Sequence, residues 1–183
     1  MEESVKDSVE FRGFQKIKRG NPFMVTITEK IDGTNACVIV QDGEVVGAQS
    51  RNRMITPEND NAGFAQWVEE NKEDLKELGD GYHYGEWAGP GIQKNRHEFP
   101  EKTFLLFNSF RWRDREGVRV RPECCEVVPV LFEGILSPAM FVEILNELEA
   151  TEPDPEGVVV YHHTSRAYTK NTFQFPGGKW AKR

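Results

Sequence analysis

Short hydrophobic runs with an alternating pattern dominate the chain, and they predict β-strands. Residues 22–31 alternate in this way and are rich in β-branched and aromatic side chains. Residues 36–41 and 44–50 flank Asp42-Gly43, a dipeptide that accepts the positive φ of a tight hairpin turn. Further strands are predicted at 82–87, 103–112, 118–121, 126–132 and 157–162.

Two segments have helical spacing instead. Between residues 61 and 78 apolar side chains recur at helical intervals, at Phe64, Trp67, Val68, Leu75 and Leu78. Ser137 and Pro138 supply an N-cap and a first-turn proline for a second helix, whose apolar stripe is Met140, Phe141, Ile144, Leu145 and Leu148. Because the helices are inserted among strands rather than alternating with them, we expect an α+β fold with antiparallel sheets flanked by helices.

Length and composition indicate how many domains the chain forms and in which cellular compartment it works. The 183 residues, with 38% hydrophobic and 29% charged side chains, are typical of one soluble domain covering 1–183. No apolar run approaches the roughly 20 residues of a membrane helix, and the acidic, polar start is unlike a signal peptide. Three cysteines, two of them adjacent, fit neither a disulfide framework nor a zinc site. We therefore expect a cytoplasmic protein with no membrane partner.

The net charge of -7 argues against a protein that coats nucleic acid by bulk attraction. The charges are segregated, however. Residues 58–80 and 143–156 each sum to -6, whereas residues 157–183 carry five bases and no acid. Five arginines between residues 111 and 121 form either a solvated face or a groove for an RNA backbone. A local positive site is thus compatible with a nucleic-acid substrate.

The first chemical signal is the stretch Glu29-Lys30-Ile31-Asp32-Gly33-Thr34-Asn35. It places an amine at the rim of a sheet, with a carboxylate and backbone amides close by. Alone, this pattern also fits an ordinary hairpin with an exposed lysine. Five further segments follow in order: Ser50-Arg51, Tyr84-Gly85-Glu86-Trp87, Leu105-Leu106-Phe107-Asn108-Ser109-Phe110, Glu156-Gly157-Val158-Val159-Val160 and Lys179-Trp180-Ala181-Lys182.

Together these six segments resemble motifs I, Ia, III, IIIa, IV and V of the covalent nucleotidyltransferases, which include ATP-dependent ligases and mRNA capping enzymes. They span residues 29–182. Asn35 stands where DNA ligases usually carry arginine, and residues 85–93 are similar to the phage-type RNA ligase 2 group. The resemblance implies the nucleotidyltransferase (adenylation) domain of ligases, with an ATP cleft, and an ATP-dependent RNA ligase activity.

The resemblance assigns the catalytic role to Lys30, which would attack the α-phosphate of ATP and carry AMP. The AMP would pass to an RNA 5′-phosphate, and an RNA 3′-hydroxyl would then displace it. A free lysine amine has a pKa of about 10.4, so such a site must favour the neutral amine by desolvation and nearby positive charge. Lys179 and Lys182 would supply charge at the α-phosphate. Their K-x-x-K spacing departs from the usual K-x-K, so the choice between them stays open, with Lys170 as a further claimant.

The resemblance also assigns the nucleotide contacts. Glu86 would accept hydrogen bonds from the ribose, and Phe107 would stack on the adenine, although it also fits an ordinary core position. Arg51, or Arg53 two residues on, would hold a phosphate or the ribose edge. The remaining contacts would be Glu29 at the adenine edge and Asn35 at the nucleotide or the RNA end.

The cofactors that the resemblance implies are ATP and Mg²⁺ or Mn²⁺. Glu156 is the first choice for the metal, through water, because Mg²⁺ keeps much of its hydration shell and prefers carboxylates. Asp32 is the second candidate. Its alternative role is an Asx-turn that stabilises the bend at Gly33.

The expected partner is RNA with 5′-phosphate and 3′-hydroxyl ends, bound by a monomer. Because the chain ends one residue past Lys182, we expect no C-terminal OB-fold or helical module. One alternative is a minimal DNA ligase or capping-type core, which Asn35 disfavours. Another is a catalytically idle nucleotide- or RNA-binding module, which the joint presence of Lys30, Glu86 and Glu156 disfavours.

Overall fold

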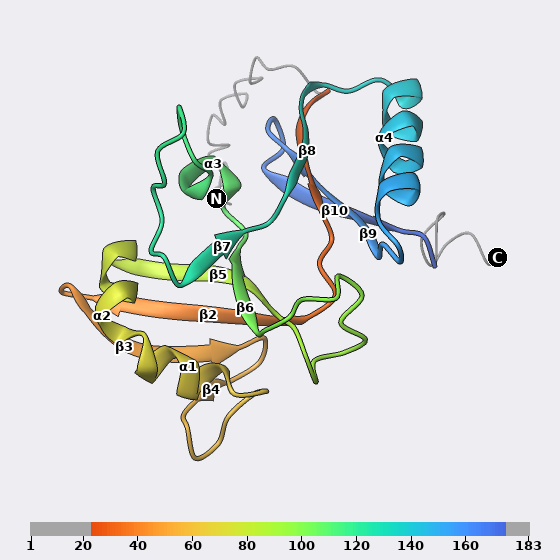
Figure 1. Cartoon of the computed structure of the whole chain (residues 1–183). Helices are drawn as coiled ribbons and strands as arrows, with labels where there is room; N and C mark the ends of the chain where they lie inside the picture. Colours follow the sequence, from red (N-terminus) through yellow and green to blue (C-terminus); the bar gives the residue numbers. More distant parts are fainter. Residues whose placement is uncertain (1–22, 175–183) are drawn as a thin grey trace, which may run out of the picture.

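Two β-sheets, joined through the segment between β1 and β2, organise the computed structural model, which describes residues 23–174 (Figure 1). The six-stranded sheet has the order β4-β3-β2-β5-β6-β7 and the four-stranded sheet the order β10-β9-β1-β8. All neighbouring strands are antiparallel except β6 and β7. The strands are β1 Met24–Glu29, β2 Thr34–Gln41, β3 Glu44–Ser50, β4 Met54–Ile55, β5 Gly81–Ala88, β6 Thr103–Leu106, β7 Cys125–Val127, β8 Val130–Ile135, β9 Gly157–His162 and β10 Ala167–Thr172.

The predicted hairpin is confirmed. β2 and β3 pair antiparallel across Asp42 and Gly43, whose φ angles are 53° and 76°. Such positive values match the right-handed twist of the strands, and asparagine, aspartate and glycine tolerate them best. The strand predicted at 157–162 is confirmed as well, with the same bounds as β9.

One face of the six-stranded sheet is covered by helices α1 (Phe64–Glu70) and α2 (Lys72–Leu75) and the 3₁₀ turn η1 (Lys76–Leu78) (Figure 1). Phe64 is fully buried there, and its ring lies 5.3 Å from that of Trp87 on β5 and 5.0 Å from that of Phe104 on β6. Such tilted aromatic contacts add to the burial of apolar surface. This core therefore fixes β5 and β6, the two strands that carry motif III and motif IIIa.

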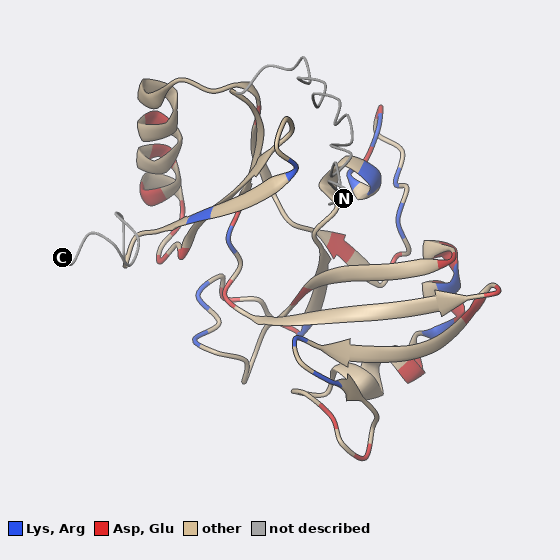
Figure 2. Ribbon diagram, turned by 180° about the vertical axis from the view of Figure 1, so that it is seen from behind, with Lys and Arg blue, Asp and Glu red and all other residues tan. Residues whose placement is uncertain are grey.

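The four-stranded sheet packs against α4 (Pro138–Thr151). The predicted cap is confirmed, because the Ser137 side chain accepts a hydrogen bond from the Met140 amide at 3.2 Å, and Pro138 begins the helix. Leu148 is buried against Val25 and Val158 of the sheet. The solvent side of α4 is acidic, and the helix carries no Lys or Arg (Figure 2). None of the helices within residues 23–174 has the length and apolarity needed to cross a membrane.

Three strand predictions differ from the structure. The run 103–112 is β6 followed by the short helix α3 (Ser109–Trp112), because Asn108 caps the amide of Arg111 and turns the chain. The run 126–132 is divided between β7 and β8, which belong to different sheets. The run 118–121 is irregular apart from a single bridge between Val118 and Arg115.

The predicted helix 61–78 begins at Phe64 and is interrupted at Asn71.

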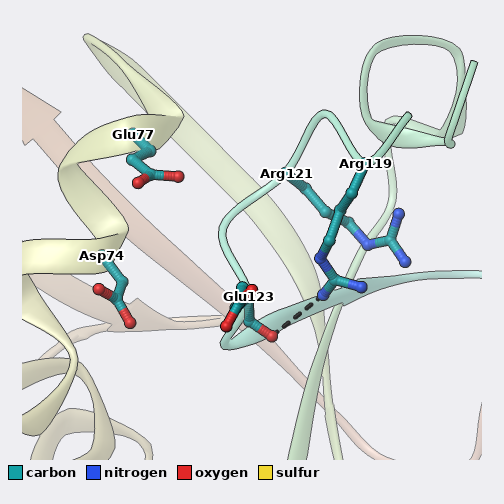
Figure 3. Close-up of a pocket in the computed structure, with 5 residues that line it drawn as sticks. All are labelled: Asp74, Glu77, Arg119, Arg121 and Glu123. Carbon is teal, nitrogen blue, oxygen red and sulfur yellow. Dashed lines mark hydrogen bonds between the residues drawn. The ribbon is translucent and has the colours of Figure 1, made fainter.

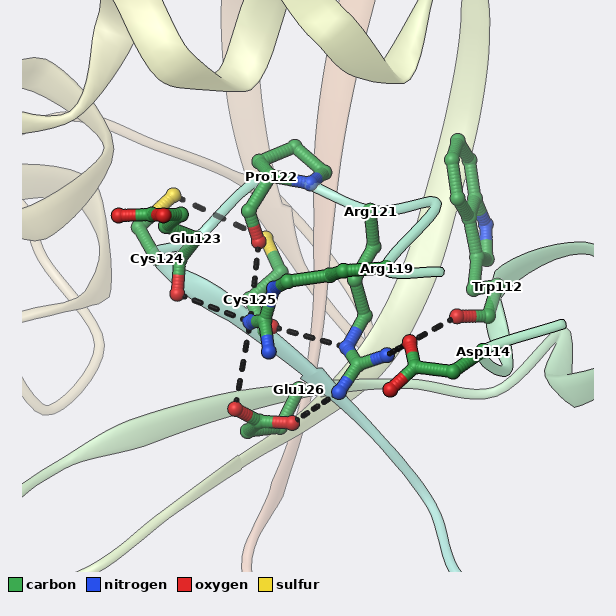
Figure 4. Close-up of polar contacts among 9 residues, drawn as sticks. All are labelled: Trp112, Asp114, Arg119, Arg121, Pro122, Glu123, Cys124, Cys125 and Glu126. Atoms are coloured by element: carbon green, nitrogen blue, oxygen red, sulfur yellow. Dashed lines mark hydrogen bonds and ion pairs between the residues drawn. The ribbon is translucent and has the colours of Figure 1, made fainter. Parts of the chain in front are cut away.

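The arginines between α3 and β7 act as internal clamps (Figure 4). Arg121 is 7% exposed, forms ion pairs with Asp114 and Glu126, and donates to the carbonyl oxygens of Trp112 and Cys125. Its neighbour Arg119 donates to three backbone carbonyls and to Glu126, while Arg113 pairs with Glu133 at 2.5 Å. These guanidinium groups bind carbonyls and carboxylates of the same chain. They thereby hold in place a segment that has little regular secondary structure.

We expect Arg121→Ala to lower the free energy of unfolding by about 2 kcal/mol, because it leaves two carboxylates and two carbonyls without their shared partner. Arg121→Lys should recover little of this loss, since one ammonium cannot reproduce the planar fork. Urea denaturation measures both. Arg115→Ala is the control, because this exposed arginine donates to a single carbonyl, that of Phe110, and has no carboxylate partner among the described residues; it should change stability by less than about 0.5 kcal/mol. Equal losses at the two positions would contradict the clamp.

Candidate functional site at the junction of the two sheets

The centre of the site is an ion pair between Lys30 and Glu156. Lys30 follows directly after β1, and Glu156 directly precedes β9. These strands pair antiparallel, and the Lys30 amide donates to the Gly157 carbonyl at 2.9 Å, so the strand ends meet. The Lys30 Nζ lies 2.6 Å from the Glu156 Oε1, with side-chain exposures of 21% and 26%. The pair is partly shielded yet accessible from solvent.

Gly157, which follows Glu156, lies where β9 and β10 come closest together. Its φ is +139°, and a Cβ there would collide with the carbonyl oxygen of Asn171 and the Cα of Thr172 on β10. The glycine thus lets β10 approach β9 closely while Glu156 turns toward Lys30.

A second glycine brings in the carboxylate of Glu86. A Cβ on Gly33 would lie 2.8 Å from the Glu86 Cγ and 2.6 Å from the Trp87 carbonyl oxygen, so the Glu86 side chain passes directly over the Gly33 backbone. Asn35 on β2 is paired in register with Glu86 on β5 and therefore lies on the same face of the sheet. The turn after Lys30 thus brings the motif I and motif III residues together.

Burial raises the pKa of Glu86 to about 7. Attraction to Lys30 opposes this shift, repulsion from Glu156 and Asp32 adds to it, and Arg51 lowers the pKa slightly. These influences show that Lys30, Asp32, Arg51, Glu86 and Glu156 share one electrostatic neighbourhood. A carboxyl with a pKa displaced by burial beside an amine is typical of a functional site.

The loop of residues 89–100 ties the site together, and the sequence did not reveal it. The Lys94 amide donates to the Asp32 carboxylate at 3.0 Å, and the Arg96 Nε lies 3.8 Å from the same oxygen. Arg96 also pairs with Asp154 at 2.6 Å. These contacts connect the segment between β1 and β2 with the segment that precedes Glu156. The basic run Lys94-Asn95-Arg96-His97, beside a glycine- and proline-rich turn, was the available signal.

The same loop restrains Glu29, the side chain expected at the adenine edge. Glu29 is 5% exposed, and its Oε1 lies 2.8 Å from the Nε2 of His97. The His97 ring stacks on Phe99 at 5.4 Å, and its other nitrogen, Nδ1, is buried with no hydrogen-bond partner in the protein. The buried Glu29 carboxylate thus has His97 as its partner, although the two residues are far apart in the sequence.

The other expected contacts are placed as follows. Phe107 comes directly after β6, is 39% exposed, and donates its backbone amide to the Tyr84 carbonyl.

Arg51 is exposed, whereas the Arg53 guanidinium binds the carbonyls of Asn59 and Asp60. The structure therefore assigns Arg53 to the support of its own loop. Lys179 and Lys182 lie outside the described residues.

Asp32 and Glu156 fit a hydrated divalent cation better than a dehydrated one. Within residues 23–174 there is no cluster of three or more His, Cys, Asp or Glu side chains that could enclose a metal. Mg²⁺ is commonly bound by one or two carboxylates together with waters and substrate phosphates, which suits this sparse set. Glu156 would hold the ion, and its present partner is Lys30. The two interactions of Asp32 with the 89–100 loop engage its carboxylate already.

A separate hollow of about 360 Å³ lies between α2, η1 and the segment before β7 (Figure 3). Charged side chains of both signs line it: Asp74, Glu77, Arg119, Arg121 and Glu123. None of them belongs to the motif residues, and Arg119 and Arg121 are engaged in the clamps described above. This hollow is therefore not the candidate active site.

Two largely antiparallel sheets meet at a junction that carries an amine, several carboxylates and the motif-bearing strand ends. This arrangement defines a nucleotidyltransferase-like domain. The model of the family described as RNA ligase matches residues 24–183. The chain belongs to the RNA ligase family. No curated protein matched the chain.

Solved structures of Naegleria gruberi RNA ligase share this fold. A mutant with ATP and Mn and another mutant in the apo form each superpose with a TM-score of 0.59 and 21% identity, over 89% of this chain and 53% of theirs. A third mutant, with AMP and Mn, has a TM-score of 0.59 and 20% identity, over 83% of this chain and 50% of its own. The chain thus spans about half the length of the ligase it matches.

The raised pKa of Glu86 predicts a pH-dependent stability. Because the folded state binds this proton more tightly than the unfolded chain, stability should fall as the pH rises from about 4.5 to about 7. Glu86→Gln cannot ionise and should gain on the order of 2 kcal/mol relative to the native protein between pH 5 and pH 8. Urea denaturation in metal-free buffer measures the difference. The exposed Glu149→Gln, as control, should show no such gain. A fall in stability with pH in Glu86→Gln equal to that of the native protein would contradict the assignment.

Proposed function

We propose that this chain is the adenylyl-transferring domain of an ATP-dependent RNA ligase, with Lys30 as its nucleophile. The observation that carries the proposal is the position of the Lys30 amine. It lies 2.6 Å from Glu156, at the junction of the sheets, with Glu86 and Arg51 in the same electrostatic neighbourhood. Membership of the RNA ligase family supports the choice of reaction.

The first transfer forms one bond and breaks another at the α-phosphorus. The neutral Lys30 Nζ donates its electron pair to phosphorus, the bond to the β-phosphate oxygen breaks, and pyrophosphate leaves with those electrons. Since the ammonium must lose a proton first, the site must favour the neutral amine, by desolvation and by the positive charge of the cation that Glu156 would hold. A bound Mg²⁺ or Mn²⁺ supplies positive charge that stabilises the phosphate oxygens. Two Naegleria ligase mutants bind ATP or AMP together with Mn, which supports this choice of cofactors.

The remaining site residues position the nucleotide. Glu86 accepts hydrogen bonds from the ribose, and its mixed protonation near neutral pH lets it also donate. Glu29, fixed by His97, reads the adenine edge, and Phe107 stacks on the ring. Arg51 holds a phosphate, and Asn35 reaches the nucleotide from the strand beside Glu86. Lys179 and Lys182 act on the α-phosphate.

The later transfers belong to the same proposal. A 5′-phosphate oxygen of RNA attacks the α-phosphorus of the lysyl adenylate and releases the amine. An RNA 3′-hydroxyl then attacks the activated 5′-phosphate, forms the phosphodiester and releases AMP. Since the chain spans half the length of the solved ligase, adenylylation is the step that its described residues support most directly.

Lys30→Ala should abolish transfer of label from α-labelled ATP to the protein, because no other described amine lies at the Glu156 carboxylate. Denaturing electrophoresis after incubation with Mg²⁺ or Mn²⁺ measures the adduct. Lys72→Ala, in a surface ion pair with Glu69, is the control and should label as the native protein does. Labelling of Lys30→Ala at the native level would overturn the assignment.

The substrate is tested on the labelled native protein. A chase with 5′-phosphorylated RNA should discharge the label to the RNA, and α-labelled GTP should leave the protein unlabelled. Discharge to nicked DNA but not to RNA would favour a DNA ligase, and labelling from GTP would favour a capping-type enzyme. Nucleotide binding without any adduct would identify an idle binding module.

A further inference from the structure

Two tyrosines stand on the face of the six-stranded sheet opposite α1 and α2. Tyr82 and Tyr84 of β5 are 59% and 53% exposed, although both lie within a strand. The residues between and after them, His83 and Gly85, point to the covered face. Large aromatic side chains that remain this exposed on a central strand commonly mark a binding surface.

The tyrosine pair is ordered by its neighbours. The two rings lie 6.3 Å apart at an interplanar angle of 19°, so they are nearly parallel. On the neighbouring strand β2, the buried residues Cys37 and Ile39 are paired in register with Tyr84 and Tyr82, so they lie beside the tyrosines on the same face. The two rings are already nearly parallel, which lowers the conformational entropy lost when a flat ligand stacks on them.

The pair continues the candidate nucleotide site. Tyr82, Tyr84 and Glu86 alternate along β5, so all three lie on one face, and Phe107 is bonded to Tyr84 through its backbone. The face therefore runs from the ribose contact, past the proposed adenine contact, to the tyrosines. Successive tyrosines are about 6.8 Å apart along the strand, so the two rings offer two separate stacking positions.

We propose that Tyr82 and Tyr84 form a stacking platform for the bases of a single-stranded RNA segment that leads to the reacting end. This inference rests on the proposed function. Aromatic side chains on an open sheet stack bases in other RNA-binding domains, without requiring a particular base sequence. The platform itself has no Lys or Arg between residues 81 and 88, so stacking rather than phosphate attraction dominates its contribution.

RNA fits this face better than a protein partner does. The exposed surface is two nearly parallel phenol rings in line with a nucleotide contact, rather than a broad aliphatic patch. Phenol rings present flat faces to a base while their hydroxyl groups stay solvated. A second protein or a second copy of this chain is the competing occupant, and the experiment separates it.

The test compares Tyr82→Ala/Tyr84→Ala with Tyr82→Phe/Tyr84→Phe and with the native protein. Fluorescence anisotropy with a labelled, 5′-phosphorylated single-stranded oligoribonucleotide gives Kd. The alanine pair should raise Kd at least about tenfold, because base stacking on an aromatic ring contributes about 1–3 kcal/mol per base. The phenylalanine pair keeps the rings and should stay within about threefold of the native value. Tyr168→Ala, an equally exposed tyrosine on the other sheet, is the matched control.

An unchanged Kd for the alanine pair would overturn the proposal, as would a loss for the phenylalanine pair equal to that for the alanine pair. Should the alanine pair fail to fold, crosslinking of the native protein to 4-thiouridine RNA decides: crosslinks at residues 82–84 support the platform, and their absence there overturns it. A concentration-dependent dimer that the alanine pair dissociates, with Kd for RNA unchanged, would assign the face to a protein partner.

The adenylylation assay distinguishes failure of this inference from failure of the proposed function. The alanine pair should still take label from ATP, since the proposed nucleotide contacts are the side chains of Glu86 and Phe107. Tyr84 holds Phe107 through its backbone carbonyl alone, which the substitution keeps. Normal labelling with an unchanged Kd for RNA would leave the ligase proposal standing and remove the platform. Absence of labelling in the native protein would remove the ligase proposal, while crosslinking would still test the platform.

Discussion

The antiparallel pairing of β1 with β9 is the constraint on which the site depends. It brings Lys30 and Glu156 together although 125 intervening residues separate them in the chain, and it holds their charged atoms 2.6 Å apart. The pairing of β9 with its other neighbour, β10, needs a glycine at position 157, because β10 passes too close for any side chain there. A partly shielded ion pair is worth little for stability on its own, since desolvation offsets much of the attraction. What the pairing provides is an amine beside a carboxylate at the junction of the sheets.

The surroundings of this pair explain how an acidic protein can present a site for a polyanion. Three carboxyl groups, of Asp32, Glu86 and Glu156, share the junction with few cations. The protein limits the repulsion by burying Glu86, so that it stays partly protonated near neutral pH, and by engaging Asp32 with the 89–100 loop. A divalent cation and ATP phosphates would complete this balance. This arrangement supports the proposed binding of a metal–nucleotide complex rather than of a bare anion.

The two faces of the six-stranded sheet have different roles: one packs against the helices, and the other carries the candidate contact residues. Aromatic side chains on the helix-covered face, among them Trp87 and Phe104, lock β5 and β6 in place. The alternation of a strand then places Glu86, Tyr84 and Tyr82 on the opposite face. Rigid strands hold functional groups more accurately than loops do. The arginine clamps before β7 serve the same end, because they fix an irregular segment without taking part in the site.

The sequence by itself determined the elements whose signals are local and the residues whose motifs are contiguous. The Asp42-Gly43 hairpin, the Ser137 cap and the strand 157–162 depend on short-range geometry, and the motif order indicated the family. Only the tertiary structure decided where 126–132 breaks between β7 and β8, because aromatic and β-branched residues pack equally well in either sheet. The strand β10 is polar and was not predicted, since its pairing with β9 rather than its composition makes it a strand. The contact of His97 with Glu29 joins positions 68 residues apart, and no pattern along the chain encodes such a distance.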